Sequence, residues 1–530
     1  MNSPLSCRRK KADGSESGAG VSPTKPSPAT ANLAQLDHRY IWHPFTQMQD
    51  WIQRDPIVIT RGEGARLWDV HGHKFLDANS SIWTNLHGHN HPKINAAIQQ
   101  QLKKIAHSSA LGLANEPASL LAENLVQLAN SGAGIPPATP GVSLANKIRV
   151  KSASGMPTPL QKVFFSDDGS TAMEVALKLA YEYARRTGRS KKPRFLTLQG
   201  AYHGDTVGAV SLGHINLFHK AYRGLLFKTD TVMAPYCYRC PFNRAQPERG
   251  DARDYRKCRW ECVATVEKKF TDQTKTGNPY AAMVVEPLIQ GAAGMIPQPH
   301  GWLGRVAEVV RGHGAQLIAD EVMTGFGRTG ERTLPRSHAP RSRDLGLFAC
   351  HQEAVQPDFL ALAKGLTGGY LPMAATLTTQ AVFDAFLGDY SEFKTFFHGH
   401  SFTGNQLGSA AALANVEMLE SPASIRARQT LQNTLRSELQ TLWSLPNVGD
   451  IRQVGLIVGV ELVKDWRTRA PFDLGERAGI RVCEAMARRG VLTRPIGNVI
   501  VLMPPYCTSA AQARQMVSVL HEAIGELYGG

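Results

Sequence analysis

The sequence predicts an α/β fold: a mostly parallel sheet with helices on both faces, followed by a smaller α+β domain. Short apolar runs that predict strands alternate with amphipathic runs that predict helices, which is typical of parallel βαβ units. The strands are expected at 163–165, 195–198, 283–286 and 317–320, and the helices at 170–186 and 301–312. After about residue 405, two helical patterns at 407–420 and 424–443 precede short mixed elements, which predicts the α+β domain.

The composition is that of an ordinary globular protein. Of its 530 residues, 42% are hydrophobic and 19% charged, and no run of 18 apolar residues predicts a membrane span. The net charge of +15 is spread along the chain without an aromatic-interleaved basic motif, which favours anionic small ligands over nucleic acid. Eight cysteines without a signal peptide predict reduced thiols and a cytoplasmic location.

The N-terminal residues 1–32 are rich in Ser, Gly, Pro and Ala, which predicts a disordered tail. Their basic start lacks the apolar segment of a secretory signal, and a transit peptide is an alternative that Asp13 and Glu16 oppose. Beyond the tail we expect three parts: an N-terminal segment of the small domain (33–105), a large cofactor-binding domain (106–405) and a C-terminal small domain (406–530). Exposed insertions are expected at 131–161 and 332–346.

Within the N-terminal segment, strands are expected at 57–60 and 66–70, and helices follow at about 93–105 and 116–129. A loop between them holds closely spaced histidines, among them His87, His89 and His91. Because the spacing is alternate and the stretch contains Gly and Pro, a polar loop beside a substrate site is favoured over a metal site.

The stretch around which the chain is organised is residues 358–369. An apolar strand at 359–363 ends at Lys364 and is followed by glycines. A lysine at the exit of a buried strand lies at a cavity floor, where burial lowers its pKa and leaves the amine able to attack a carbonyl. A surface lysine that begins a loop is the alternative.

Three further motifs follow strands in the same way. Gly169 and Ser170 open a helix after a strand, where free N–H groups and the helix dipole favour phosphate; a plain Ser N-cap is the alternative. Tyr202 stands between glycines after a strand and suits stacking on a flat ring, with an aromatic turn as the alternative. Asp320 ends an apolar strand, where a carboxylate needs a cation such as a protonated ring nitrogen. With Lys364, these groups meet the requirements of pyridoxal phosphate.

At this point the chain resembles the class III, fold-type I pyridoxal-phosphate aminotransferases over residues 38–527. The resemblance rests on Asp320-Glu-Val-Met-Thr-Gly-Phe-Gly-Arg-Thr-Gly330, Ala363-Lys364-Gly and Gly169-Ser170. It implies that Lys364 forms an imine with the cofactor and later moves the substrate proton, and that Asp320 holds the ring nitrogen protonated. It also implies that Tyr202 stacks on the ring and that Gly169 and Ser170 bind the phosphate.

The same resemblance gives a role to residues 398–401. This stretch would reach the cofactor phosphate of a neighbouring subunit through His400 and Ser401, which implies a homodimer.

Other stretches resemble the branch of this family that acts in biotin synthesis, the 7,8-diaminononanoate synthases. These stretches are residues 41–46, 80–92, 202–206, 367–369 and 493–495. The resemblance implies transfer of an amino group to 8-amino-7-oxononanoate. Arg494 would pair with the substrate carboxylate, Trp83 would line an apolar channel, and Gly399, Tyr202 and Lys364 would contact the substrate, with Asp205 close by.

The amino donor stays open between S-adenosylmethionine and L-lysine. Phe45, the pair Ile82-Trp83 and the pair His400-Ser401 depart from the pattern of enzymes that use S-adenosylmethionine and resemble the lysine-using branch. Two other readings also remain: another class III enzyme acting on an ω-amino acid or diamine, and a non-enzymatic binding module. The combination of Lys364, Asp320 and the phosphate motif opposes the last.

Four cysteines have a spacing known from metal sites. Cys237, Cys240, Cys258 and Cys262 form two pairs, as in four-thiolate zinc or iron–sulfur sites. The alternative is four reduced loop thiols, since transamination needs no metal. No metal ligand is therefore assigned, and a structural metal stays open.

Overall fold

The computed structural model describes residues 28–131, 158–330 and 346–529. The first five residues of helix α1 (Pro28–Tyr40) lie within the stretch 1–32 predicted to be a disordered tail. Residues 1–27, and most of both predicted insertions, lie outside the described residues. The chain divides into two compact units, one up to Thr60 with Trp68–His73 and one with all other residues. This division does not test the predicted boundaries at 105/106 and 405/406, which stay predictions.

The first unit is organised around two aspartates. Trp51 Nε1 donates a hydrogen bond to Asp37 Oδ1 (2.7 Å), and His43 Nε2 lies 2.9 Å from Asp37 Oδ2, which ties α1 to α2 (Met48–Trp51). Asp69 Oδ1 accepts from the backbone of His73 (2.8 Å) in the turn after β2. The sequence boundaries between the two units fall within strands β1 (Ile59–Glu63) and β2 (Arg66–Asp69).

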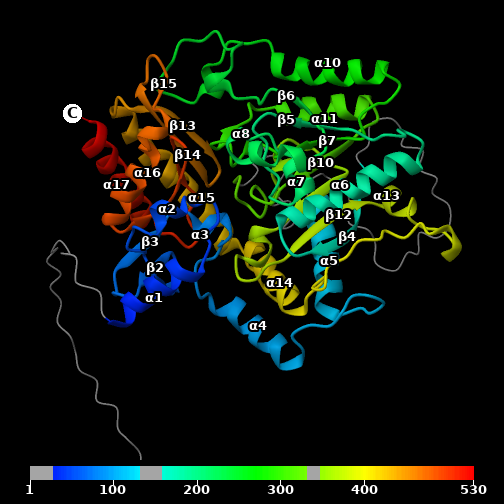
Figure 1. Cartoon of the computed structure of the whole chain (residues 1–530), viewed down its shortest axis with the longest axis horizontal. Coiled ribbons are helices and arrows are strands. Elements are labelled where there is room, and N and C mark those ends of the chain that lie inside the picture. The colour runs from blue at the N-terminus through cyan, green and yellow to red at the C-terminus, as the bar shows by residue number, and fades with distance from the viewer. Residues whose placement is uncertain (1–27, 132–157, 331–345, 530) are drawn as a thin grey trace, which may run out of the picture. The chain divides into compact units, whose positions relative to one another are not determined.

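The second unit contains a seven-stranded sheet in the order β4-β12-β11-β10-β7-β5-β6 (Figure 1). Its strands are β4 (Leu160–Ser166), β5 (Phe195–Leu198), β6 (Asp230–Val232), β7 (Ala282–Val285), β10 (Gln316–Asp320), β11 (Phe359–Leu362) and β12 (Ala374–Thr379). Only β12 runs against its neighbours, β11 and β4. The mostly parallel sheet is thus confirmed, although β4 begins two residues inside the predicted insertion at 131–161.

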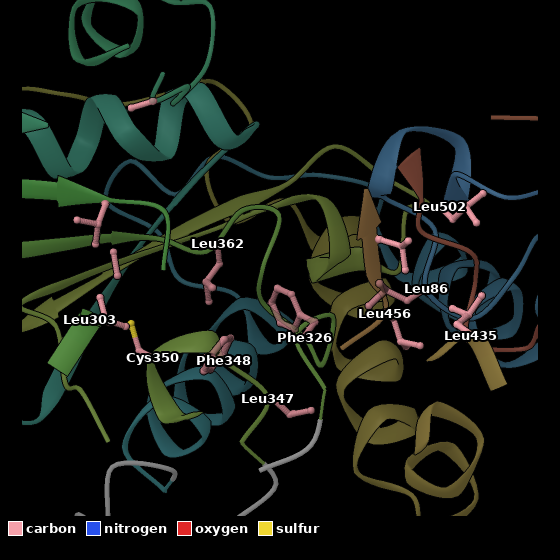
Figure 2. Packing of buried hydrophobic residues seen from close by; sticks show 14 of the residues in the cluster. Leu86, Leu303, Phe326, Leu347, Phe348, Cys350, Leu362, Leu435, Leu456 and Leu502 are labelled. Carbon is pink, nitrogen blue, oxygen red and sulfur yellow. The ribbon is translucent and has the colours of Figure 1, made fainter. Parts of the chain in front are cut away.

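Helices cover both faces of this sheet. Successive strand residues point to opposite faces, so that Leu317 and Ala319 pack in one buried cluster and Ile318 in another. The first cluster contains residues of α5 (Glu116–Ser131), α10 (Glu261–Lys275) and α11 (Trp302–Gly312). The second contains residues of α6 (Gly169–Arg186), α7 (Val207–Leu212) and α13 (Gln380–Asp384). Figure 2 shows Leu303, Phe326 and Leu362 in the first cluster.

The C-terminal part is α+β, as predicted. Its antiparallel sheet has the order β13-β14-β18-β17, with β15 paired to β14. The strands are β13 (Val448–Val454), β14 (Ile457–Asp465), β15 (Ala470–Pro471), β16 (Val491–Leu492), β17 (Pro495–Ile496) and β18 (Val499–Leu502), and the helices are α14 (Gln406–Glu420), α15 (Pro422–Glu438), α16 (Ala478–Arg488) and α17 (Ala510–Tyr528). Strand β16 pairs with β3 (Lys74–Asp77) in parallel, which joins the N-terminal segment to this part.

The remaining elements are short, apart from one helix. They are α3 (Ser80–Trp83), α4 (Pro92–Lys104), α8 (Asn216–His219), α9 (Ala252–Tyr255), α12 (Ala349–Gln352), β8 (Ile289–Gln290) and β9 (Ile296–Pro297), with 3-10 turns η1 (Lys220–Leu225), η2 (Cys237–Arg239), η3 (Lys364–Thr367), η4 (Tyr390–Glu392), η5 (Leu439–Ser444) and η6 (Leu474–Glu476). Within the described residues, no helix has both the length and the apolarity that a membrane span requires.

Candidate active site

Most of the predicted site residues meet at the edge where the parallel strands end. Five of the seven strands lead into residues that line one cavity of about 440 Å³, and this edge is where α/β sheets bind ligands. The residues are Gly169 and Ser170 after β4, Tyr202 and His203 after β5, Glu286 after β7, Asp320 at the end of β10, and Lys364 after β11. Trp83 also lines the cavity.

Lys364 is the first residue of η3, so the chain passes from the strand into a 3-10 turn rather than a simple glycine turn. Its backbone has a φ of +42°, a left-handed value that side-chain-bearing residues seldom adopt. Burial lowers the pKa of its amine, while Asp320 and Glu286 oppose the shift. Its Nζ lies 5.5 Å from the ring centroid of Trp83. A neutral amine in this position is a competent nucleophile.

Asp320 is buried, with 5% of its surface exposed, and has a histidine partner. His203 Nδ1 lies 2.7 Å from Asp320 Oδ2, and the backbone N–H of Val322 donates to Asp320 Oδ1 (3.1 Å). A buried carboxylate with these partners is held in one orientation and can face a cation in the cavity. The sequence analysis assigned no role to His203, although it follows Tyr202 directly.

The start of α6 at Gly169 and Ser170, here called the α6 cradle, could hold an anion. Asp168 caps the helix by accepting from the backbone of Thr171 (2.9 Å), and Thr171 Oγ1 accepts from the backbone of Asp168 (2.9 Å). Ser170 Oγ accepts from the backbone of Asp205 (3.1 Å). A Cβ at Gly204 would overlap Ser170 Oγ, so the two backbones approach closely only because Gly204 has no side chain. The dipole of this 18-residue helix favours a phosphate here.

Tyr202 lines the cavity beside this cradle. Its hydroxyl donates to Asp205 Oδ2 (2.5 Å), and its pKa is raised, first by burial and then by Asp205. The phenol therefore stays protonated, and its ring lies nearly parallel to that of His219, with 6.3 Å between the ring centroids.

Glu286 is a site residue that the sequence analysis missed. Its carboxylate is buried and accepts from the backbone N–H groups of Gly291 (2.8 Å) and Tyr202 (3.2 Å). Burial raises its pKa to about 7, Asp320 adds to the rise, and His203 opposes it. The signal that identified Asp320, a carboxylate at the end of an apolar strand, is also present at 283–286 and could have found Glu286.

Four predicted residues do not line the cavity: Gly399, His400, Ser401 and Arg494. His400 Nδ1 lies 3.1 Å from Oδ2 of Asp167, which does line it. The carbonyl of Ser401 accepts from His107 Nε2 (2.8 Å). Arg494 is exposed between β16 and β17. The predicted roles of these four residues would therefore be exerted outside the lining of this cavity.

The four cysteines of the possible metal motif influence one another electrostatically. Burial raises the pKa of Cys237 to about 12, and Cys262, Cys258 and Cys240 add to the rise while Arg256 opposes it. In the part of the chain that the structure describes, no group of three or more His, Cys, Asp or Glu side chains is placed to hold a metal ion. The structural-metal alternative therefore gains no support from this geometry.

The cavity joins a half-buried lysine, a buried carboxylate, an aromatic ring and a helix N-terminus, a set that fits pyridoxal phosphate. Residues 48–524 match the model of the aminotransferase class-III family, and the chain belongs to this family. Pyridoxal phosphate is the cofactor of these enzymes, and the cofactor prediction is confirmed.

Individual relatives are similar over nearly their whole length. The adenosylmethionine-8-amino-7-oxononanoate aminotransferase of Geobacter sulfurreducens is 44% identical over 94% of this chain and 99% of its own. A crystal structure of the enzyme of that name from Methanocaldococcus jannaschii has 38% identity and a TM-score of 0.79, covering 94% of this chain and 99% of its own. A PLP-bound amine transaminase from an uncultivated Pseudomonas species has 31% identity and a TM-score of 0.77, covering 92% and 98%.

Proposed function

We propose that this aminotransferase converts 8-amino-7-oxononanoate to 7,8-diaminononanoate in biotin synthesis. One observation carries the chemistry: the Lys364 amine, the Asp320–His203 pair and the α6 cradle face one cavity. The substrate is supported by relatives at 38–44% identity that are named for it. The amine transaminase at 31% identity supports a second candidate, an enzyme that acts on an ω-amino acid or a diamine, and the test below includes it.

The roles of the cofactor-binding residues follow from their positions. Pyridoxal phosphate supplies an electron sink for the charge left when the substrate carbon loses its proton. Lys364 would bind the cofactor covalently and carry that proton, since its burial favours the neutral amine. Asp320 would hold the ring nitrogen protonated, Tyr202 would cover one face of the ring, and Gly169 and Ser170 would bind the phosphate.

The substrate would contact two sets of residues. Trp83 and Met323 give the cavity an apolar wall suited to a fatty-acid-like chain. Arg494, an exposed guanidinium outside that wall, would bind the carboxylate at the far end of the chain. The long separation between the reacting carbon and the carboxylate of the substrate requires such a distant partner.

We further propose that the active unit is a homodimer in the cytoplasm. Gly399, His400 and Ser401 would then serve the cavity of the partner, with Gly399 near the substrate and the other two near the phosphate. The segment that precedes and contains them exposes several large apolar side chains, as interfaces do: Leu387, Tyr390, Phe393, Phe397 and Phe402. The seven cysteines of the described residues are free thiols, as expected in a reducing compartment.

The test is an assay of purified protein with pyridoxal phosphate, 8-amino-7-oxononanoate and one donor, either S-adenosylmethionine or L-lysine. Formation of diaminononanoate with either donor supports the proposal and identifies the donor. Transamination of ω-amino acids or diamines without diaminononanoate formation would favour the second candidate. Size-exclusion chromatography with light scattering tests the dimer, and a monomeric active enzyme would contradict it.

A further inference from the structure

The turn that carries Lys364 has a strained backbone. Lys364 has a φ of +42°, and such left-handed residues cost about 1–3 kcal/mol unless their surroundings hold them. Within the turn, the backbone N–H of Leu366 donates to the carbonyl of Ala363 (2.9 Å), and that of Gly368 donates to the carbonyl of Gly365 (3.0 Å). Contacts from outside the turn add to these two bonds.

Asn415, on α14, supplies two of these contacts. Its Nδ2 donates to the carbonyl of Gly365 (2.9 Å) and to the carbonyl of Leu366 (2.9 Å). These are the two peptide carbonyls that directly follow Lys364 in the chain. Asn415 has no exposed surface, so water does not compete for its amide.

His87 fixes the orientation of that amide. Its Nε2 lies 2.9 Å from Asn415 Oδ1, and because Nδ2 already faces two carbonyls, Oδ1 must accept and His87 must donate. Burial lowers the pKa of His87 to about 4, with the hydrogen bond to Asn415 opposing the shift. The ring is therefore neutral near pH 7, with its proton on Nε2.

The loop that brings His87 packs directly on the same turn. The backbone N–H of Leu86 donates to the carbonyl of Gly368 (3.3 Å). A Cβ at Gly365 would lie 3.1 Å from Leu86 Cδ1, and a Cβ at Gly369 would lie 2.7 Å from Asn85 Cα. The turn is thus clamped between α14 and the loop at 85–88.

We infer that Asn415, oriented by His87, is a positioning residue for this aminotransferase: it holds the strained turn so that the Lys364 amine faces the cofactor cavity. Asn415 does not line the cavity, and its effect is exerted through the carbonyls of Gly365 and Leu366. The inference rests on the proposed role of Lys364 in binding pyridoxal phosphate.

The test compares Asn415→Leu with a matched variant, Asn130→Leu. Asn130 is also a buried amide whose Nδ2 donates to two backbone carbonyls, those of Val126 (2.9 Å) and Leu160 (2.8 Å), and it does not line the cavity. Each full-length protein is freed of cofactor, and pyridoxal phosphate is added back at several pH values. The rate of colour development, the dissociation constant and the thermal unfolding of the cofactor-free protein are measured.

Both variants should unfold at lower temperature, because Asn415→Leu loses three buried hydrogen bonds and Asn130→Leu loses four. Only Asn415→Leu should also raise the dissociation constant for pyridoxal phosphate by at least about tenfold. It should also move the pH midpoint of cofactor capture upward, since an amine released toward water needs a higher pH to become neutral. Equal capture, affinity and midpoint in Asn415→Leu and wild type would overturn the inference, as would the same changes in Asn130→Leu.

If Asn415→Leu does not fold, His87→Phe is the second variant that tests the inference. This change removes only the bond that orients the amide, so it should shift the midpoint in the same direction by a smaller amount. An unshifted midpoint in a folded His87→Phe protein would then overturn the inference. Failure of the wild-type protein to capture pyridoxal phosphate at all would instead contradict the proposed function.

Discussion

His203 Nδ1 lies 2.7 Å from Asp320 Oδ2, and both side chains are buried, although His203 follows β5, Asp320 ends β10 and β7 lies between these two strands. Together with the backbone N–H of Val322, which donates to Asp320 Oδ1 (3.1 Å), this histidine holds the carboxylate in one orientation. We expect Asp320→Asn to lower kcat by at least about a hundredfold, because an amide cannot stabilise a protonated ring nitrogen electrostatically. His203→Asn should lower it by a smaller factor. Steady-state kinetics checks both, and a His203 effect larger than that of Asp320 would contradict this order.

Lys364→Ala should abolish the yellow colour of the bound cofactor and lower activity at least about a thousandfold, because the variant loses both the covalent link and the proton carrier. Absorbance spectra and product assays check this. Lys220→Ala, which removes an exposed lysine on η1, is the control and should retain both properties. Persistence of the covalent cofactor spectrum in Lys364→Ala would refute the proposed role.

Glu286 should make stability depend on pH. Burial raises its pKa from 4.5 to about 7, so between these values the folded protein keeps a proton that the unfolded chain releases. Its contribution is fully present below about pH 4.5 and is lost as the pH rises through about 7, a difference of up to about 3 kcal/mol. Glu286→Gln cannot titrate, so the variant should gain stability relative to wild type from pH 5 to pH 8. Thermal unfolding at four pH values checks this, and a pH-independent difference would count against it.

Gly204→Ala should weaken cofactor binding by at least about tenfold, the effect of losing a hydrogen bond to a charged group. The residue has a φ of +124°, and a new Cβ would overlap Ser170 Oγ in the phosphate cradle. Equilibrium titration with pyridoxal phosphate measures the change. Gly250→Ala is the control, because no atom lies within 4 Å of a Cβ at that position.

Arg494→Gln should raise KM for 8-amino-7-oxononanoate by about ten- to a hundredfold through loss of a charged hydrogen bond. Because the carboxylate lies far from the reacting carbon, kcat should change little. Arg488→Gln, at the end of α16, removes another exposed guanidinium and should leave KM unchanged. Equal KM values for wild type and Arg494→Gln would contradict the proposed contact.

Much of the candidate site was predictable because its signals are local. Lys364 and Asp320 each end an apolar strand, and Gly169 and Ser170 join a strand to a helix, so their neighbours in sequence reveal their positions. His203 was harder to interpret, because its partner Asp320 is 117 residues away. No local pattern reports such a pair.

The sequence by itself determined the class of fold, the family and the residues at the strand ends, because hydrophobic periodicity and strand-end polar groups depend on near neighbours. The tertiary structure decided the rest. It placed antiparallel β12 between β4 and β11, paired His203 with Asp320, and brought Asn415 and His87, 328 residues apart, behind the Lys364 turn. These relationships depend on which distant segments share a buried surface, and the packing of the whole chain sets that choice.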